Sequence, residues 1–262
     1  MNAHELQLQP RLQLLADLVP ENARLVDVGT DHGYLPVWLL CHNRIKSAIA
    51  ADIGKEPLQH AQRTAAQYGV TEGLRFLLCD GLRGIKPGEA DTVVIAGMGG
   101  ETVIHILSQA PWTKDGCLLL LQPMTKQESL RRWLNENGYT QLGEHLVRDK
   151  NYLYPVFLVR GGAQRALTEA EIYGGVSIEC DPLAGEYLSQ RIEKLRAAAE
   201  GLSRSQREED HRHSAVQQHL AAVLEESLQT KVKPQTGLDL REICKRQATQ
   251  KATQISRHKV LT

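Results

Sequence analysis

The sequence predicts an α/β fold of seven strands, in which five parallel strands are closed by an antiparallel pair and followed by a hairpin of two long helices. Three observations predict this fold. Strand-like and helix-like segments alternate from residue 24 to residue 137. Two strand-like segments then follow with no helix between them. From Thr168 onward glycine and β-branched residues become rare, and Ala, Glu, Gln, Arg and Leu dominate.

The alternating region supplies the parallel strands and the helices that cover them. A first helix is expected over Leu6–Leu18, where leucines recur at helical spacing and Pro20 follows. The expected strands are Arg24–Val28, Ser47–Asp52, Leu74–Cys79, Thr92–Ala96 and Cys117–Gln122, and the expected helices among them are Leu35–Cys41, Glu56–Tyr68, Glu101–Gln109 and Lys126–Asn137. A continuous apolar run such as Leu118–Leu121 indicates a strand buried on both faces, which is typical of a parallel sheet.

The sheet is expected to close with Thr140–Val147 and Tyr152–Val159. The link between these strands is too short for a crossover, so they must pair antiparallel. A dinucleotide-binding fold would continue with a strand and a helix instead. An antiparallel closure is the pattern of the Rossmann-like sheet of class I methyltransferases.

The C-terminal helices are expected at about 183–202 and 206–228, with a break near 201–205. Their apolar residues recur every three or four positions, as in an antiparallel coiled coil. Such a hairpin either contacts a partner or only packs on the sheet domain. We therefore expect a sheet domain at 1–163, a helical domain at 164–230 and a poorly ordered basic tail at 231–262.

Composition excludes several classes of protein. No apolar run approaches the roughly 20 residues that cross a bilayer, and the N-terminal residues lack the regions of a signal peptide. The five cysteines are scattered and form no Cys-x-x-Cys pair, so neither a disulfide framework nor a zinc site is indicated. We expect a cytoplasmic protein with no membrane segment and no metal.

Charge is balanced overall, with 31 Lys or Arg and 31 Asp or Glu, but it is unevenly spread. From Gln229 to Thr262 there are 8 Lys or Arg and 2 Asp or Glu, so this tail carries about +6 and the rest of the chain about −6. The tail is interpreted either as a solvated segment or as an electrostatic arm for nucleic-acid phosphates.

The most informative segment is the turn that follows the first strand, where residues 27–33 read Asp-Val-Gly-Thr-Asp-His-Gly. A strand that enters a glycine turn and then a helix is the nucleotide-binding element of open α/β sheets. In a dinucleotide turn a central glycine lets a pyrophosphate approach the backbone, but here that position holds Asp31. A carboxylate repels a phosphate and attracts the ammonium or sulfonium group of S-adenosylmethionine. The turn therefore predicts a site for that cofactor, the alternative being a tight turn without a ligand, and its candidate residues are Asp27, Gly29, Thr30, Asp31 and Gly33.

Acidic residues also end the second and third strands. Asp52, followed by Ile53, is expected to accept hydrogen bonds from both ribose hydroxyls of a nucleoside. Asp80, followed by Gly81, is expected to accept a hydrogen bond from the adenine amino group. The alternative is that Asp80 only caps the strand, as acidic residues often do. Ligands of open α/β sheets bind at these strand ends, which supports one shared nucleoside site.

The fourth and fifth strands end in segments that predict the acceptor side of the site. Residues 96–100 read Ala-Gly-Met-Gly-Gly, and this density of glycine indicates either backbone brought close to a ligand or a strained turn. Gly97 and Met98 are thus expected at the floor of an acceptor pocket. After the fifth strand, Gln122 and Pro123 present an amide that is expected to bond a base edge or, alternatively, backbone within the sheet.

Four segments give the chain a family resemblance. They are residues 27–36, residues 96–100, the Leu-Gln-Pro of 121–123, and 130–139, which read Leu-Arg-Arg-Trp-Leu-Asn-Glu-Asn-Gly-Tyr. Together they resemble the bacterial tRNA (adenine-N1)-methyltransferases that act on adenine 22, and the resemblance runs from about Leu12 to Leu228. It implies a Rossmann-like catalytic domain, S-adenosylmethionine as methyl donor, tRNA as partner and a coiled-coil domain that contributes to tRNA binding. It also implies that Asp27, Gly29, Asp31, Asp52 and Asp80 line the cofactor site.

Three features depart from the family pattern. Met124 stands where Asn often follows Gln-Pro, and methionine lacks the amide with which asparagine would contact a base. Asp52 stands where Glu is frequent, and this exchange keeps the ribose role. The basic tail after Lys231 has no counterpart.

The implied reaction needs little covalent chemistry from the protein, since adenine N1 attacks with an in-plane lone pair. The candidate catalytic residues are Asp31, His32, Gly97, Met98, Gln122 and Pro123, and His32 and Tyr34 are candidates for contact with the base. The alternative for His32 is a structural role, in which its ring only forms hydrogen bonds within the turn. A non-catalytic RNA-binding protein and a nicotinamide-dependent reductase are the alternative functions, and a monomer is expected.

Overall fold

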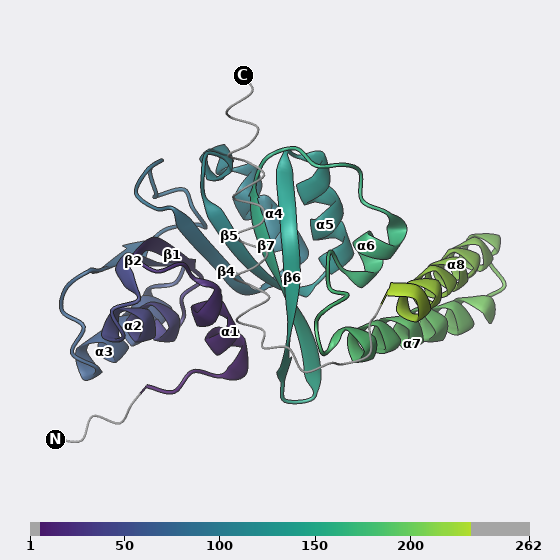
Figure 1. Cartoon of the computed structure of the whole chain (residues 1–262), viewed down its shortest axis with the longest axis horizontal. Coiled ribbons are helices and arrows are strands. Elements are labelled where there is room, and N and C mark those ends of the chain that lie inside the picture. The colour runs from purple at the N-terminus through teal and green to yellow at the C-terminus, as the bar shows by residue number, and fades with distance from the viewer. Residues whose placement is uncertain (1–5, 232–262) are drawn as a thin grey trace.

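The computed structural model describes residues 6–231 (Figure 1). The predicted tail at 232–262 lies outside the described residues, as do residues 1–5. No helix in the described part is long and apolar enough to cross a membrane.

The sheet has seven strands in the order β3-β2-β1-β4-β5-β7-β6. The strands are β1 Ala23–Val28, β2 Ile45–Asp52, β3 Leu74–Leu78, β4 Thr92–Gly99, β5 Leu118–Thr125, β6 Tyr139–Asp149 and β7 Tyr152–Gly161. The first five are parallel, β7 runs antiparallel to β5, and β6 pairs antiparallel with β7. The predicted parallel core with an antiparallel closure is confirmed.

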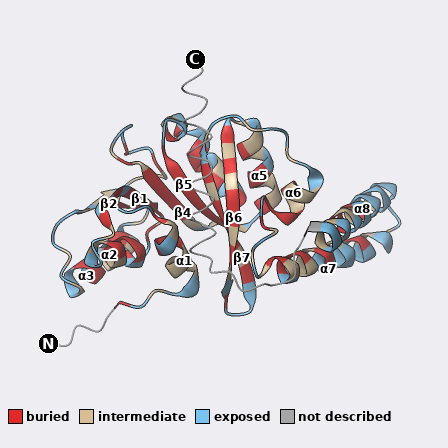
Figure 2. Cartoon of the chain, viewed as in Figure 1, coloured by how far each residue is buried: buried red, intermediate tan, exposed pale blue. Residues whose placement is uncertain are grey.

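Helices cover both faces of the sheet (Figures 1 and 2). The helices are α1 Pro10–Leu18, α2 Tyr34–Cys41, α3 Lys55–Gln67, α4 Gly100–Ser108 and α5 Gln127–Glu136, with a short 3-10 turn at Pro111–Lys114. Leucines of α1 and α2 pack on one face, and apolar residues of α4 and α5 pack on the other. The run Leu118–Leu121 in β5 is buried between these layers, as its apolar sequence predicts.

Several boundaries differ from the predicted ones. Strand β4 continues to Gly99, past the predicted end at Ala96, because Met98 and Gly99 still pair with β5. The first helix begins at Pro10 and not at Leu6, because proline favours the first position of a helix and Leu6 instead packs near Val37 and Trp38. Strand β5 continues to Thr125, past the predicted end at Gln122, because Pro123 and Thr125 still pair with β4.

The C-terminal part contains α6 Glu169–Gly174, α7 Ala184–Ser203 and α8 Glu208–Lys231. Helices α7 and α8 form the predicted hairpin, which projects from the sheet domain in Figure 1. The base of this hairpin packs on β6 and β7, since Leu146 and Leu153 share an apolar cluster with Leu188 and Leu224. The short helix α6 lacks a counterpart in the predicted elements. It joins α5 to α8, so the hairpin is anchored to the sheet domain.

Candidate functional site

The turn between β1 and α2 is held by hydrogen bonds of its own residues. The Thr30 hydroxyl donates to Asp27 Oδ2 at 2.7 Å, and the Gly29 and Thr30 amides donate to Ala51 O on the neighbouring strand. Gly29, Asp31 and Gly33 all have positive φ, at 71°, 49° and 67°. Asp31 is the one non-glycine residue of the three, and a positive φ is uncommon for such residues. Strained backbone of this kind persists where the surrounding structure imposes it, often at binding sites.

Asp27 lies beneath this turn and is almost fully buried. Burial raises the pKa of its carboxyl to about 6, the hydrogen bond from Thr30 opposes that rise, and the nearby charge of Asp52 adds to it. Asp27 and Thr30 thus stabilise the turn from inside. Their direct contact with a cofactor stays a prediction.

Asp52 lies beside the turn because β1 and β2 are neighbouring parallel strands. Its Oδ1 accepts from the Gly54 amide at 2.8 Å, and its Oδ2 accepts from the Asp31 amide at 3.4 Å. Two backbone donors therefore orient the carboxylate, and each oxygen keeps a free lone pair. Ile53 follows it and is 74% exposed, so an apolar surface lies next to an oriented acid.

Asp80 and Gly81 lie after β3, next to β2, in the segment that leads to β4. The Asp80 carboxylate forms an ion pair with Arg83 at 3.1 Å, and both side chains are partly exposed. Gly81 has φ +58° and packs against Ile106 of α4. The predicted contact between Asp80 and an adenine amino group requires one carboxylate oxygen to remain available beside Arg83.

The glycine-rich segment at the end of β4 lies against both the cofactor turn and the end of β5. A β-carbon on Gly29 would lie 2.3 Å from Met98 Cε, and one on Gly100 would lie 2.3 Å from Lys126 O. Gly97 has φ +76° with no atom within 4 Å of the position of a β-carbon. Glycine is therefore favoured here by the left-handed backbone conformation and not by lack of space. The glycines therefore allow residues 97–100 to pass closely between two neighbouring loops.

Gln122 is fully buried at the end of β5. Its amide oxygen accepts from Arg11 Nη1 at 3.0 Å and from the Gly97 amide at 3.2 Å. Arg11 also donates to Asp149 Oδ2 at 2.6 Å. The arrangement matches the alternative in which Gln122 supports backbone, and its contact with a base stays a prediction. Pro123 is buried, and its carbonyl oxygen accepts from Gln127 Nε2 at 3.4 Å.

Arg11 was not anticipated from the sequence. It lies in the first turn of α1, and its partners Gln122 and Asp149 are 111 and 138 residues away. No local pattern indicates so distant a pair of contacts.

His32 forms part of a stack of three rings at the mouth of the turn. Its ring lies 5.3 Å from that of Tyr34 and 4.9 Å from that of His60, with interplanar angles of 9° in both pairs. Potential metal-ligating atoms of Asp31, His32 and His60 also lie within 4.8 Å of one another. The absence of a metal stays a prediction.

Comparison with known proteins shows which family the chain resembles. A family model described as a methyltransferase domain matches residues 8–157. The tRNA (adenine(22)-N(1))-methyltransferase of Bacillus subtilis (strain 168) is 33% identical over 188 residues, which cover 71% of this chain and 77% of that protein.

Solved structures agree with the sequence relatives. A putative tRNA (m1A22) methyltransferase of Streptococcus pneumoniae has a TM-score of 0.77 at 27% identity, covering 85% of this chain and 100% of that one. A structure of the same protein in complex with S-adenosyl-L-methionine has a TM-score of 0.72 at 28% identity, covering 82% and 97%.

Proposed function

The chain belongs to the methyltransferase-domain family and, within it, to the tRNA (adenine(22)-N(1))-methyltransferases, and on that premise we propose that it methylates N1 of adenine 22 in tRNA with S-adenosylmethionine as the methyl donor. The observation that carries the proposal is the contact between Met98 and Gly29. This contact joins the candidate acceptor loop to the candidate cofactor turn, as direct transfer between two bound molecules requires.

The residues at the strand ends fit S-adenosylmethionine, which supplies an electrophilic methyl group on a sulfonium. Asp52 has an oriented carboxylate with free lone pairs for ribose hydroxyls. Asp31 has an exposed carboxylate for the ammonium or sulfonium group, and the exposed Ile53 offers an apolar cover for a flat base. Asp80 is the proposed partner of the adenine amino group.

The proposed task of the acceptor loop is to position the base. Neutral adenine N1 carries an in-plane lone pair, so no residue has to remove a proton before transfer. Holding N1 in line with the methyl group lowers the barrier by as much as roughly 7–11 kcal/mol in intramolecular models. The methylated ring is cationic, and Asp31 together with the carbonyl groups of residues 97–100 is proposed to stabilise that charge.

The target adenine must first leave its stack in the folded tRNA. We propose that the ring stack of His32, Tyr34 and His60 receives the base, because His32 follows Asp31 in the turn and the stack offers a partly exposed aromatic surface. The α7–α8 hairpin is proposed to bind the body of the tRNA. Action on tRNA also supports a cytoplasmic location, and the monomeric state stays a prediction.

The proposal is tested with unmodified tRNA, the purified protein and a labelled methyl donor. Nucleoside mass spectrometry should detect 1-methyladenosine in tRNA that has adenine at position 22 and none in the same tRNA with guanine there. A different methylated nucleoside, or equal yields from the two tRNAs, would contradict the assignment. The nicotinamide-dependent reductase lacks support from the fold, because β6 and β7 close the sheet as an antiparallel pair.

A further inference from the structure

A cleft of about 380 Å³ lies where the end of β5, the start of β7 and helix α7 meet. Its lining includes three cationic and three tyrosine side chains: Lys126, Arg191, Lys194, Tyr152, Tyr154 and Tyr187. Of the described residues that line the cleft, none is acidic. A positive cleft with aromatic walls is suited to a nucleic-acid strand, since cations contact phosphates and rings stack on bases.

The cleft is joined to the candidate acceptor loop. Lys126 O lies against Gly100, and Thr125 Oγ1 lies against Gly99, as the positions of added β-carbons at 2.3 and 3.1 Å show. Lys126 itself has φ +55°, a left-handed conformation outside glycine. The segment that forms one wall of the cleft is therefore the segment on which the glycine loop rests.

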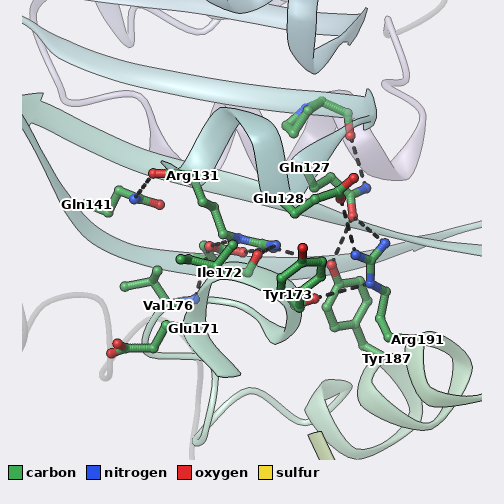
Figure 3. A network of polar contacts seen from close by, with 12 residues as sticks. Gln127, Glu128, Arg131, Gln141, Glu171, Ile172, Tyr173, Val176, Tyr187 and Arg191 are labelled. Carbon is green, nitrogen blue, oxygen red and sulfur yellow. Dashed lines mark hydrogen bonds and ion pairs between the residues drawn. The ribbon is translucent and has the colours of Figure 1, made fainter. Parts of the chain in front are cut away.

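The opposite wall is fixed by a polar network that joins α5, α6 and α7 (Figure 3). Arg191 donates to Tyr173 O at 3.2 Å and pairs with Glu128 at 3.3 Å, and the Tyr187 hydroxyl donates to Gln127 Oε1 at 3.1 Å. These contacts immobilise Arg191 and Tyr187 before any ligand arrives. A site built in advance loses less entropy on binding.

The tyrosines at the start of β7 supply an open stacking surface. Tyr152 is 61% exposed, although tyrosine is a large side chain that proteins usually cover in part. Its ring lies 6.2 Å from that of Tyr154, which in turn lies under Arg11 at 5.3 Å. Arg11 also holds Gln122, so the stacking surface and the acceptor loop share one support.

We propose that this cleft binds a nucleotide of the tRNA strand next to the methylated adenine. The phosphate is assigned to Lys126, Lys194 and Arg191, and the base is assigned to Tyr152. The inference rests on the proposed function and adds to it a second contact, which holds the strand while the target base is turned out. The volume of the cleft also fits a single nucleotide, because it lies in the range of pockets that bind small ligands.

The test compares two cleft variants, Tyr152→Ala and Lys126→Ala/Lys194→Ala, with a matched control, Lys46→Ala, whose lysine is exposed on β2, beside the edge strand β3. We expect each cleft variant to raise the KM for tRNA by roughly tenfold, the scale of one lost stacking or phosphate contact. The affinity for S-adenosylhomocysteine, measured by calorimetry, should not change. Tyr152→Phe should keep the wild-type KM, because phenylalanine retains the ring.

Salt dependence gives a second, independent readout. The double lysine variant should show a shallower fall of tRNA affinity with salt, by about 0.7–0.9 in the logarithmic slope for each phosphate contact removed. Wild-type KM and slope in the variants would overturn the inference, and so would a loss of S-adenosylhomocysteine affinity, which would assign the cleft to the cofactor. Failure of the proposed function itself is distinct, because the wild-type protein would then not methylate tRNA.

Discussion

The side chain of Met98 occupies the space that a side chain at Gly29 would need. A β-carbon at Gly29 would lie 2.3 Å from Met98 Cε, well inside van der Waals contact. Gly29 belongs to the turn after β1, and Met98 belongs to the last residues of β4. The two candidate halves of the site therefore share one contact, made by the end of the Met98 side chain, and a side chain at Gly29 would displace it.

Replacing Gly29 with alanine should therefore damage the site more than backbone strain alone predicts. Gly29→Ala adds a clash to an unfavourable φ of +71°, and we expect weaker S-adenosylhomocysteine binding and slower methylation. Gly69→Ala is the matched control, because Gly69 has φ +72° with no atom within 4 Å of an added β-carbon. It should lose only about 1–2 kcal/mol of stability and keep full cofactor affinity.

A second substitution tells whether the clash is the cause. Removing the Met98 side chain in Gly29→Ala/Met98→Ala should restore part of the cofactor affinity, measured by calorimetry as a coupling between the two sites. Strictly additive losses would show that Met98 and Gly29 act independently.

Asp52→Ala should weaken S-adenosylmethionine binding by about 1.5–3 kcal/mol, the usual scale for hydrogen bonds to a charged group. The carboxylate accepts from the Gly54 and Asp31 amides, so its loss also releases the turn. Asp17→Ala serves as the control, since Asp17 is an exposed acid on α1. Calorimetry that finds equal affinity in a folded Asp52→Ala protein would remove Asp52 from the cofactor site.

Asp27 should make stability fall as pH rises. Its pKa is about 6 in the folded protein and 3.8 in a model peptide, so the folded state holds a proton that the unfolded state has released. The resulting stabilisation is complete below the unfolded pKa and is lost as pH rises through the folded pKa. It amounts to about 3 kcal/mol.

Asp27→Asn isolates this effect, because its amide oxygen can still accept from Thr30 while the titrating group is gone. The difference in unfolding free energy between wild type and Asp27→Asn, measured by urea denaturation, should change in favour of the variant between about pH 4 and pH 7. Parallel stability profiles over that range would show that Asp27 does not titrate there.

The sequence predicts the sheet well because each parallel strand carries its own signal. Leu118–Leu121 indicates burial on both faces, and β5 is indeed covered by helices on both sides. Helix α6 was missed although Thr168 and Glu171 form a capping box that marks its start. The helix is only 6 residues long, too short to show an apolar period.

The candidate site likewise contains residues that local sequence patterns predict and contacts that they do not predict. The turn at Gly29 and the acid at Asp52 follow directly from strands, so a local pattern places them together. The support of Gln122 by Arg11 depends on contacts across more than 100 residues, and the ring of His60 comes from the helix after the next strand. Neither contact leaves a periodic pattern in the sequence.

Arg11 should act by positioning the acceptor loop. Arg11→Ala leaves the buried Gln122 amide oxygen with one donor fewer and removes the partner of Asp149, and we expect a loss of about 1–3 kcal/mol in stability. The methylation rate should fall more than the affinity for S-adenosylhomocysteine, because Gln122 holds Gly97. Arg24→Ala, which breaks an exposed pair with Asp91, should change stability by about 1 kcal/mol or less and leave the rate intact. An equal fall in rate and cofactor affinity would contradict a positioning role.

The last prediction concerns the α7–α8 hairpin. Removing all of it would also remove Tyr187 and Leu188, which pack against the sheet domain, so such a deletion tests folding as much as binding. A better variant replaces residues 197–216 with a short glycine-serine turn. The two helices lie side by side at this level, because the Ser214 hydroxyl of α8 donates to Ala199 O of α7 at 2.8 Å, so a short turn can join residues 196 and 217.

The shortened hairpin should keep its cofactor affinity while its tRNA affinity falls sharply. Arg204, Arg207 and Arg212 lie in the removed segment, and Arg204 carries an exposed ion pair with Glu200 that tRNA phosphates can replace. Replacing these three arginines with alanine in the full chain should lower tRNA affinity and flatten its dependence on salt, since fewer counterions are released on binding. Circular dichroism should find the helices intact in that variant. If the shortened protein methylated tRNA with wild-type kcat and KM, the distal hairpin would have a structural role and the tRNA contacts would have to lie on the sheet domain.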